Sequence, residues 1–283
     1  MTLAADHRAL VEDLLPERVE ALEAVGDGWD CFTYEVNGSW IVQLPRDEKA
    51  AQAIRRQRLL LSELWREVSV AVPVPEVWSD EPVLMAYRKI DGEPLDEAFL
   101  ESGAGLVPER LGRFLYDLHL IPVEVLGLRP VAAAVWRAGY EELLDDFRAR
   151  VFPLLEEPER AAAQSMFDRF LETEARFATA LHHGDLGPAH ILRTPGGDLA
   201  GVIDWGDAVQ GDPARDFGWV LFAGEDFGER ALGAYGGAPD QTFRDRARFY
   251  HRIGPWHEVT YGLDTEQPSF VHRGLDGIRE RLV

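Results

Sequence analysis

The spacing of apolar residues changes once along this chain, near residue 89, and this change restricts the fold more than any other feature. Up to residue 88, short strand-like runs surround one long helical pattern, whereas helical spacing dominates afterwards. Asn37 and Gly38 supply the positive φ angles of a tight hairpin between two of the runs. We therefore predict an α+β fold with two lobes: a small N-terminal lobe over residues 1–88, with a five-stranded sheet plus one helix inserted in it, and a large, mostly helical C-terminal lobe over residues 89–283.

The same patterns give approximate element bounds. In the first lobe they predict a short helix at 7–15, strands at 19–25, 32–36, 40–44, 76–78 and 83–88, and a long helix at 47–67. In the second lobe they predict a hairpin of 191–193 with 200–203 inside a loop-rich segment at 182–215, and helices at 110–120, 137–151, 161–180, 214–222, 229–234, 242–261 and 270–281. Two unlike lobes predict a cleft between them, where ligand sites are common.

Charge and composition narrow the classes of function. The formal net charge is -21, which repels nucleic acid and attracts a cationic small molecule, although the same charge also suits plain solubility. No apolar run approaches the roughly 18 residues of a membrane span, and no secretory signal pattern opens the chain. The single cysteine, Cys31, rules out an internal disulfide. We expect a cytoplasmic protein with no nucleic-acid or membrane partner, monomeric rather than oligomeric.

The residues with the clearest chemistry flank the predicted hairpin of the second lobe. Asp185 and Asp204 lie about twenty positions apart, each where a strand meets a loop, and His190 follows Asp185 by five positions. Phosphoryl transfer requires an aspartate that accepts the proton of the attacking hydroxyl, and oxygen-rich ligands that hold magnesium on the phosphates. We expect Asp185 to be the catalytic base, and His190 and Asp204 to bind Mg²⁺.

Two other interpretations of these residues remain open. Each aspartate alone is a common turn residue. A zinc site made of His182, His183 and His190 is a rival to the magnesium site, although the spacing matches no familiar zinc pattern and adjacent side chains on extended backbone point in different directions.

Three segments in order resemble the aminoglycoside phosphotransferase family: His183-Gly-Asp-Leu with His190-Ile-Leu, Val202-Ile-Asp-Trp-Gly-Asp207, and Gly211-Asp-Pro-Ala-Arg-Asp-Phe217. The resemblance implies a two-lobed protein-kinase-like fold, Mg²⁺, and transfer of the γ-phosphoryl group of ATP or GTP to a hydroxyl. A histidine at 190 and the stretch 261–279 resemble aminoglycoside 2″-phosphotransferases, and macrolide phosphotransferases also carry that histidine. The resemblance further implies that the loop 26–30, with Gly26 and Gly28, covers the nucleotide phosphates.

The nucleotide site departs from the family pattern at two positions. Gln43 stands where the family has a Lys or Arg that grips the phosphates, and Gln57 stands where it has the paired Glu. Two glutamines can hydrogen-bond to each other, and Arg46 or Lys49 are candidates to replace the missing charge. The resemblance also places the hinge between the lobes at 85–89, so that backbone groups around Met85 and Tyr87 contact the purine.

The acceptor site is expected beside the catalytic loop. Asp207, Glu225, Asp226 and Glu258 are candidates to pair with the ammonium groups of a cationic acceptor, or are simply solvated surface. Trp219, Trp256 and Tyr261 either stack on sugar rings or pack between helices. Three functions follow: a kinase for aminoglycoside antibiotics, a kinase for a macrolide or another small hydroxylated metabolite, or a catalytically weak nucleotide- or ligand-binding protein.

Overall fold

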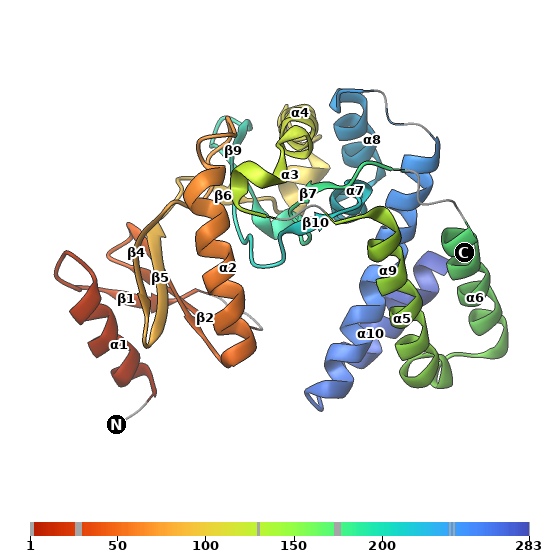
Figure 1. Ribbon diagram of the computed structural model, residues 1–283, viewed down its shortest axis with the longest axis horizontal. Coiled ribbons are helices and arrows are strands. Elements are labelled where there is room, and N and C mark those ends of the chain that lie inside the picture. The colour runs from red at the N-terminus through yellow and green to blue at the C-terminus, as the bar shows by residue number, and fades with distance from the viewer. Residues whose placement is uncertain are drawn as a thin grey trace.

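The computed structural model describes residues 3–282, apart from 26–29, 129–130, 173–176, 238 and 240. A sheet-rich N-terminal part and a helical C-terminal part lie side by side along the longest axis of the molecule (Figure 1). This arrangement confirms the α+β fold with two unlike lobes. The division after residue 88 remains a prediction, although the last strand of the first sheet ends at Arg88.

The N-terminal sheet is antiparallel, in the order β1-β2-β3-β5-β4. Its strands are β1 (Leu22–Ala24), β2 (Cys31–Val36), β3 (Trp40–Pro45), β4 (Pro75–Asp80) and β5 (Val83–Arg88). The turn between β2 and β3 has φ angles of 54° at Asn37 and 68° at Gly38, as the Asn-Gly pair predicts.

Alternation along the strands decides which helix covers which face of the sheet. Trp40, Val42 and Leu44 share one apolar cluster with α1 (Leu3–Leu14), whereas Val83, Met85 and Tyr87 pack with α2 (Glu48–Leu64) in the main core. Gln43 alternates with that first set, so it lies on the face toward α2. The N-cap of α2 is Asp47, whose side chain accepts the backbone N–H of Ala50 at 2.8 Å.

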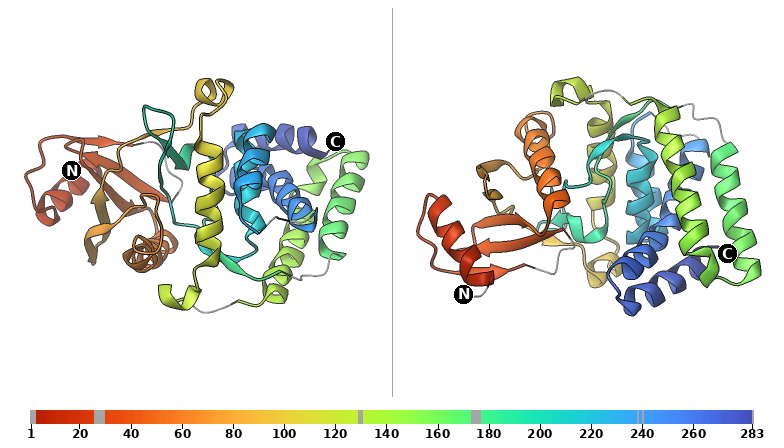
Figure 2. Two further views of the ribbon diagram at one scale, coloured as in Figure 1. Left: turned by 90° about the horizontal axis from the view of Figure 1, so that it is seen from above. Right: turned by 60° about the horizontal axis from the view of Figure 1, so that its bottom comes forward.

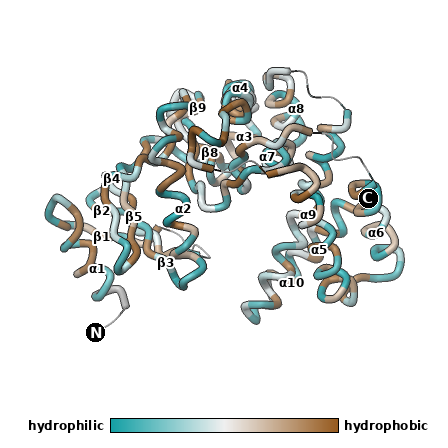
Figure 3. Tube along the Cα trace, in the orientation of Figure 1, coloured by the Kyte–Doolittle hydropathy of each residue, from teal (hydrophilic) through white to brown (hydrophobic). Residues whose placement is uncertain are grey.

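The C-terminal part consists mostly of helices, together with a small set of short strands (Figure 2). The helices are α3 (Glu97–Glu101), α4 (Val107–Leu120), α5 (Ala133–Arg150), α6 (Glu157–Glu172), α7 (Ala214–Val220), α8 (Glu225–Ala234), α9 (Gln241–Asp264) and α10 (Pro268–Leu282). The strands are β6 (Glu93–Pro94), β7 (Ala180–His182), β8 (Ile191–Arg193), β9 (Leu199–Val202) and β10 (Val209–Gly211). Apolar and polar residues are mixed along these elements (Figure 3), and no described helix is long and apolar enough to cross a membrane.

The predicted hairpin of the second lobe is confirmed as β8 and β9, but several bounds were wrong. The helix expected at 161–180 does not reach Ala180, which begins β7. The expected loop 182–215 contains β10, and α8 begins four residues before the predicted 229. β7 and β10 have three residues each and, within the described part of the chain, pair only with each other, so neither is long enough to show a recognisable period in the sequence.

Candidate active site

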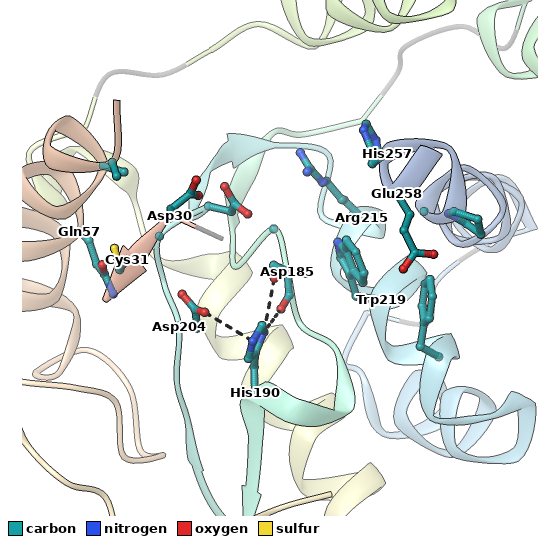
Figure 4. A pocket seen from close by; sticks show the side chains of 18 of the residues that line it. Asp30, Cys31, Gln57, Asp185, His190, Asp204, Arg215, Trp219, His257 and Glu258 are labelled. Carbon is teal, nitrogen blue, oxygen red and sulfur yellow. Dashed lines mark hydrogen bonds and ion pairs between the residues drawn. The ribbon is translucent and has the colours of Figure 1, made fainter. Parts of the chain in front are cut away.

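A cavity of about 1220 Å³ opens between the N-terminal sheet with α2 and the helices α7, α9 and α10 (Figure 4). The N-terminal wall includes Asp30, Cys31, Gln43, Lys49, Arg56 and Gln57. The loops around β8 and β9 contribute Gly184, Asp185, His190, Asp204 and Asp207. The helical wall includes Arg215, Trp219, Phe222, Glu258, Arg273, Asp276, Glu280 and Arg281. The structure therefore brings to one cavity Asp185, His190, Asp204, Asp207, Gln43, Gln57 and Glu258, while the role expected of each stays a prediction.

The loop that carries Asp185 is held from behind by a buried carboxylate. Both oxygens of Asp216 accept backbone N–H groups, from His183 and from Gly184, each at 3.0 Å. Gly184 has φ of 89°, and a Cβ there would lie 2.5 Å from the carbonyl oxygen of Asp207. Only glycine fits, so the backbone at 184 and the carboxylate of Asp216 together fix where Asp185 begins.

Asp216 stays ionised because other groups outweigh its burial. Burial alone would raise the pKa of Asp216, but the hydrogen bond from His119 and the nearby His182 and His183 hold that pKa well below its usual range. Nε2 of His119, on α4, lies 3.1 Å from Oδ2 of Asp216, and its Nδ1 lies 3.0 Å from the hydroxyl of Tyr235. The sequence analysis missed His119, since nothing in its local pattern connects it to a residue 97 positions away.

The pKa of Asp185 is shifted in the direction that suits a base. Burial, with smaller contributions from Asp207 and Asp204, raises the pKa of Asp185 to about 6, while His190 opposes the shift. The carboxylate is therefore mostly ionised at neutral pH and binds a proton far more readily than an ordinary aspartate does.

His190 joins the two aspartates of the site. Its Nδ1 donates to the backbone oxygen of Asp185 at 2.6 Å and lies 3.6 Å from Oδ2 of Asp185. Its Nε2 then carries a lone pair, which faces Oδ2 of Asp204 at 3.5 Å (Figure 4). The lone pair of Nε2 and the carboxylate oxygen of Asp204 therefore face each other, and a cation bound between them could be coordinated by both. With only two protein ligands, the pair suits Mg²⁺, which usually completes its coordination with waters and substrate phosphates.

The rival zinc site does not form. Both ring nitrogens of His183 are occupied: Nε2 donates to the carbonyl of Ile203 at 2.9 Å, and Nδ1 accepts the N–H of Asp185 at 3.3 Å. His182 is fully buried, with its ring 5.1 Å from that of Trp136. Across the described residues, no group of three or more His, Cys, Asp or Glu is placed to hold a metal by itself.

The expected hydrogen bond between the two glutamines is absent. Gln43 and Gln57 are both buried and both line the cavity, yet Oε1 of Gln43 and Nε2 of Gln57 have no partner. An acceptor and a donor so placed would satisfy each other if the side chains met. Each of the two buried glutamines therefore has one polar atom without a hydrogen-bond partner.

The other residues predicted to contact the nucleotide are Gly26, Gly28, Met85 and Tyr87. Gly26 and Gly28 lie outside the described residues. Met85 and Tyr87 are buried in β5 and are not among the residues that line the cavity. Met85 pairs with Gln43 on one side and Trp78 on the other, so the sheet already uses the backbone there. A hinge that offers free backbone groups is therefore wrong at Met85, and the chain leaves the strand only after Arg88.

Of the four acceptor candidates, two lie at the cavity and two do not. Asp207 and Glu258 line it, and Glu258 is ion-paired with Arg273. Glu225 and Asp226 are instead highly exposed residues of α8. Their side chains face Arg248 at 3.3 Å and Arg230 at 3.8 Å. These are surface ion pairs, and the structure does not bring either carboxylate to the site.

The three aromatic candidates for the acceptor site lie in different surroundings. Trp219 lines the cavity and stacks on Phe222, with 5.1 Å between ring centroids. Trp256 is fully buried, and Tyr261 packs against Phe270 at 5.0 Å, so both of these have the packing role. Arg215 and Asp276 line the same cavity but were not predicted, and Asp30, the last residue of the predicted phosphate-covering loop 26–30, lines it as well.

The chain is similar to known proteins over nearly its whole length. Residues 21–250 match the family model described as phosphotransferase enzyme family. Viomycin phosphotransferase of Streptomyces vinaceus is 29% identical over 298 aligned residues, which cover 99% of this chain and 100% of that protein. The GDP and kanamycin complex of APH(2″)-IIIa superposes with a TM-score of 0.88 at 24% identity, over 99% of this chain and 98% of that one. Macrolide 2′-phosphotransferase MphH from Brachybacterium faecium gives 0.76 at 22% identity, over 96% and 97%.

Proposed function

The chain belongs to the phosphotransferase enzyme family, and from this membership we propose that it transfers the γ-phosphoryl group of ATP or GTP to a hydroxyl of a cationic antibiotic, an aminoglycoside in the first instance. The observation that carries the proposal is Asp185, a base with a pKa of about 6 that shares a cavity with the His190 and Asp204 pair. Membership of an enzyme family, together with this intact set, removes the ground for a purely binding protein.

In the proposed reaction, one proton moves to Asp185, one P–O bond forms and another P–O bond breaks. Asp185 accepts the proton of the acceptor hydroxyl as its oxygen forms the new bond to the γ-phosphorus. The bond from that phosphorus to the bridging oxygen breaks, and the nucleoside diphosphate leaves. Asp204 and His190 would hold Mg²⁺, which supplies neutralising charge to the phosphates when it is bound.

The acidic walls favour a cationic acceptor. Asp207 beside the catalytic loop, and Glu258, Asp276 and Glu280 on α9 and α10, all line the cavity. Part of this charge is neutralised, since Arg273 pairs with Glu258 and Arg279 lies 3.3 Å from Asp276, which leaves Asp207 and Glu280 without an ion pair among the described residues. The carboxylates left unpaired favour an acceptor with several ammonium groups, so an aminoglycoside suits this cavity better than a macrolide, which carries a single basic amine, or a neutral sugar.

A second acceptor is viomycin. It is supported by the relative of that name, which aligns with 99% of this chain. Since nucleoside triphosphates are cytoplasmic metabolites, either proposal includes a cytoplasmic location, and a monomeric state remains a prediction.

The test is magnesium-dependent release of nucleoside diphosphate with ATP or GTP, against kanamycin, gentamicin, viomycin, a macrolide and simple sugars. Mass spectrometry of the acceptor then shows whether one phosphoryl group has been added. Turnover on a cationic antibiotic supports the proposal and names the acceptor. Turnover only on a neutral sugar overturns the cationic assignment, and turnover only on a macrolide, which carries a single basic amine, overturns the aminoglycoside as acceptor.

A further inference from the structure

The N-terminal wall of the cavity is expected to bind the nucleotide phosphates, but β3 brings no positive charge to it, because Gln43 stands where the family pattern has a lysine or an arginine. A nucleoside triphosphate carries several negative charges, and the cavity already holds the carboxylates of Asp30, Asp185, Asp204 and Asp207. Gln43 on β3 is neutral and mostly buried, so it cannot offset this repulsion. If the cavity binds a triphosphate, another residue of the same wall has to supply the cation.

The structure separates the two candidates near the end of β3. The guanidinium of Arg46 lies 4.1 Å from the ring centroid of Phe32, and Arg46 is not among the residues that line the cavity. Lys49, in the first turn of α2, does line it and is exposed there. Among the described residues, the ammonium of Lys49 makes no hydrogen bond or ion pair, so it is available to a ligand.

Lys49 is close enough to the site to act on its charges. Burial raises the pKa of Asp30, and the field of Lys49 is the largest influence that opposes this rise. Lys49 and Asp30 thus share one part of the cavity. Arg56, which also lines the cavity, follows Lys49 by two helical turns, about 10 Å along the axis, so α2 presents two cations on one face.

A second observation at the same wall also points to a ligand. Oε1 of Gln43 and Nε2 of Gln57 are buried polar atoms without partners, in side chains only 8% and 4% exposed. Orphaned polar atoms of this kind are rare in folded proteins, because each costs free energy unless something binds it. The side-chain amide of Gln57 can donate to a phosphate oxygen. A cation next to that phosphate would come from α2, since Gln43 on β3 is neutral.

We propose that Lys49 makes the cationic contact to the donor nucleotide phosphates that Gln43 cannot make, with Nε2 of Gln57 as a neutral donor to the same group. This inference rests on the proposed function and specifies how its nucleotide is held. The charge of the phosphate-binding wall is carried by the first turn of α2 and not by β3.

The chain offers a matched control, because it contains only two lysines. Lys89 ends the stretch 85–89 that was predicted as the hinge, but the structure takes it out of the site. It does not line the cavity, its backbone N–H donates to the carbonyl of Ser39 at 2.9 Å, and its Nζ lies 2.7 Å from Oε2 of Glu35. Dissociation constants of ATP, GTP and the corresponding nucleosides are measured by calorimetry for the unaltered protein and for Lys49→Met, Lys49→Arg and Lys89→Met. Lys49→Met should weaken triphosphate binding about ten- to a hundredfold and leave nucleoside binding unchanged. Lys49→Arg should restore most of the affinity, and Lys89→Met should match the unaltered protein.

The outcomes distinguish this inference from the proposed function. Triphosphate binding by Lys49→Met that equals that of the unaltered protein overturns the role of Lys49 and leaves the kinase proposal standing. Failure of the unaltered protein to bind any triphosphate overturns both. Equal losses for the triphosphate and the nucleoside would show that Lys49 acts on the fold of the lobe and not on phosphates, which also contradicts the proposal.

Chemical labelling tests the same point without a variant. Pyridoxal 5′-phosphate condenses with a lysine amine to an imine with loss of water, and borohydride reduces the imine to a stable secondary amine. Peptide mapping should find Lys49 labelled and protected by ATP or GTP, with Lys89 unprotected. Labelling of Lys49 that a saturating triphosphate does not reduce would contradict the assignment.

Discussion

Nε2 of His190 lies 3.5 Å from Oδ2 of Asp204, while the other ring nitrogen donates to the backbone oxygen of Asp185. The hydrogen bond to the backbone fixes the tautomer and turns a lone pair toward the carboxylate. A cation held between the two side chains is therefore connected, through one imidazole ring, to the loop that carries the proposed base.

A nitrogen ligand in this position predicts an unusual metal preference. Imidazole suits Mn²⁺ and later metals better than it suits Mg²⁺, whereas the amide oxygen of asparagine prefers the harder ion. His190→Asn should therefore lower the ratio of activity with Mn²⁺ to activity with Mg²⁺, and His190→Ala should cut metal affinity by about tenfold or more. Steady-state rates in metal titrations check both. Identical ratios for the asparagine variant would show that His190 does not touch the metal.

The raised pKa of Asp185 predicts where activity fails in acid. A base works only when it is ionised, and burial raises the pKa of Asp185 to about 6. The value of kcat/KM should fall about tenfold for each pH unit below that point. Circular dichroism over the same range controls for unfolding. A profile that stays flat to pH 5 would show that no group with this pKa limits the reaction.

The same shift predicts that the proposed base costs stability. The folded-state pKa lies above the ordinary value of 3.8, so the ionised form is penalised at every pH above about 6, and the penalty vanishes below about 4. A rise in pKa from 3.8 to about 6 corresponds to about 3 kcal/mol, which solvent screening reduces to about 1–2 kcal/mol because the side chain is 32% exposed. Asp185→Asn should raise the free energy of unfolding by that amount at pH 7.5, as denaturant titration would show. The gain should disappear at pH 4, and a variant that is no more stable at pH 7.5 would contradict the raised pKa.

The network behind the catalytic loop predicts the opposite effect. His119→Ala removes a hydrogen bond from the fully buried Asp216, which should lower the free energy of unfolding by about 2–3 kcal/mol at pH 7. The folded-state pKa of Asp216 is depressed, so this contribution is present above about pH 4 and is lost as the carboxylate is protonated in acid. The exposed His272→Ala provides the control, with a change within about 0.5 kcal/mol. Equal stability of the two variants would exclude the network.

The sequence identified the parts of the site that lie close together in the chain. One stretch of about twenty residues contains all three key residues, with Asp185 and His190 before the hairpin and Asp204 after it. Their order and spacing were therefore enough to connect them. The family resemblance assigned Gln43 and Gln57 to one nucleotide site, and the structure places both in the wall of the same cavity, while their contact with a nucleotide stays a prediction.

The parts it missed depend on contacts between distant segments. Nothing near His119 shows that it meets Asp216, and nothing near Glu225 shows that α8 turns it away from the cavity toward Arg248. The supposed bond between Gln43 and Gln57 failed for the same reason. The pattern brought both residues to one wall, but side-chain packing decides whether two amides meet.

The central claim is that Asp185 accepts the proton in a phosphoryl transfer. The most direct measurement compares acceptor-dependent release of nucleoside diphosphate by the unaltered protein and by Asp185→Asn, with the nucleotide dissociation constant of each. The account predicts that the variant loses at least about 100-fold in kcat while its nucleotide affinity stays within about threefold. Turnover by Asp185→Asn at the rate of the unaltered protein would contradict the account.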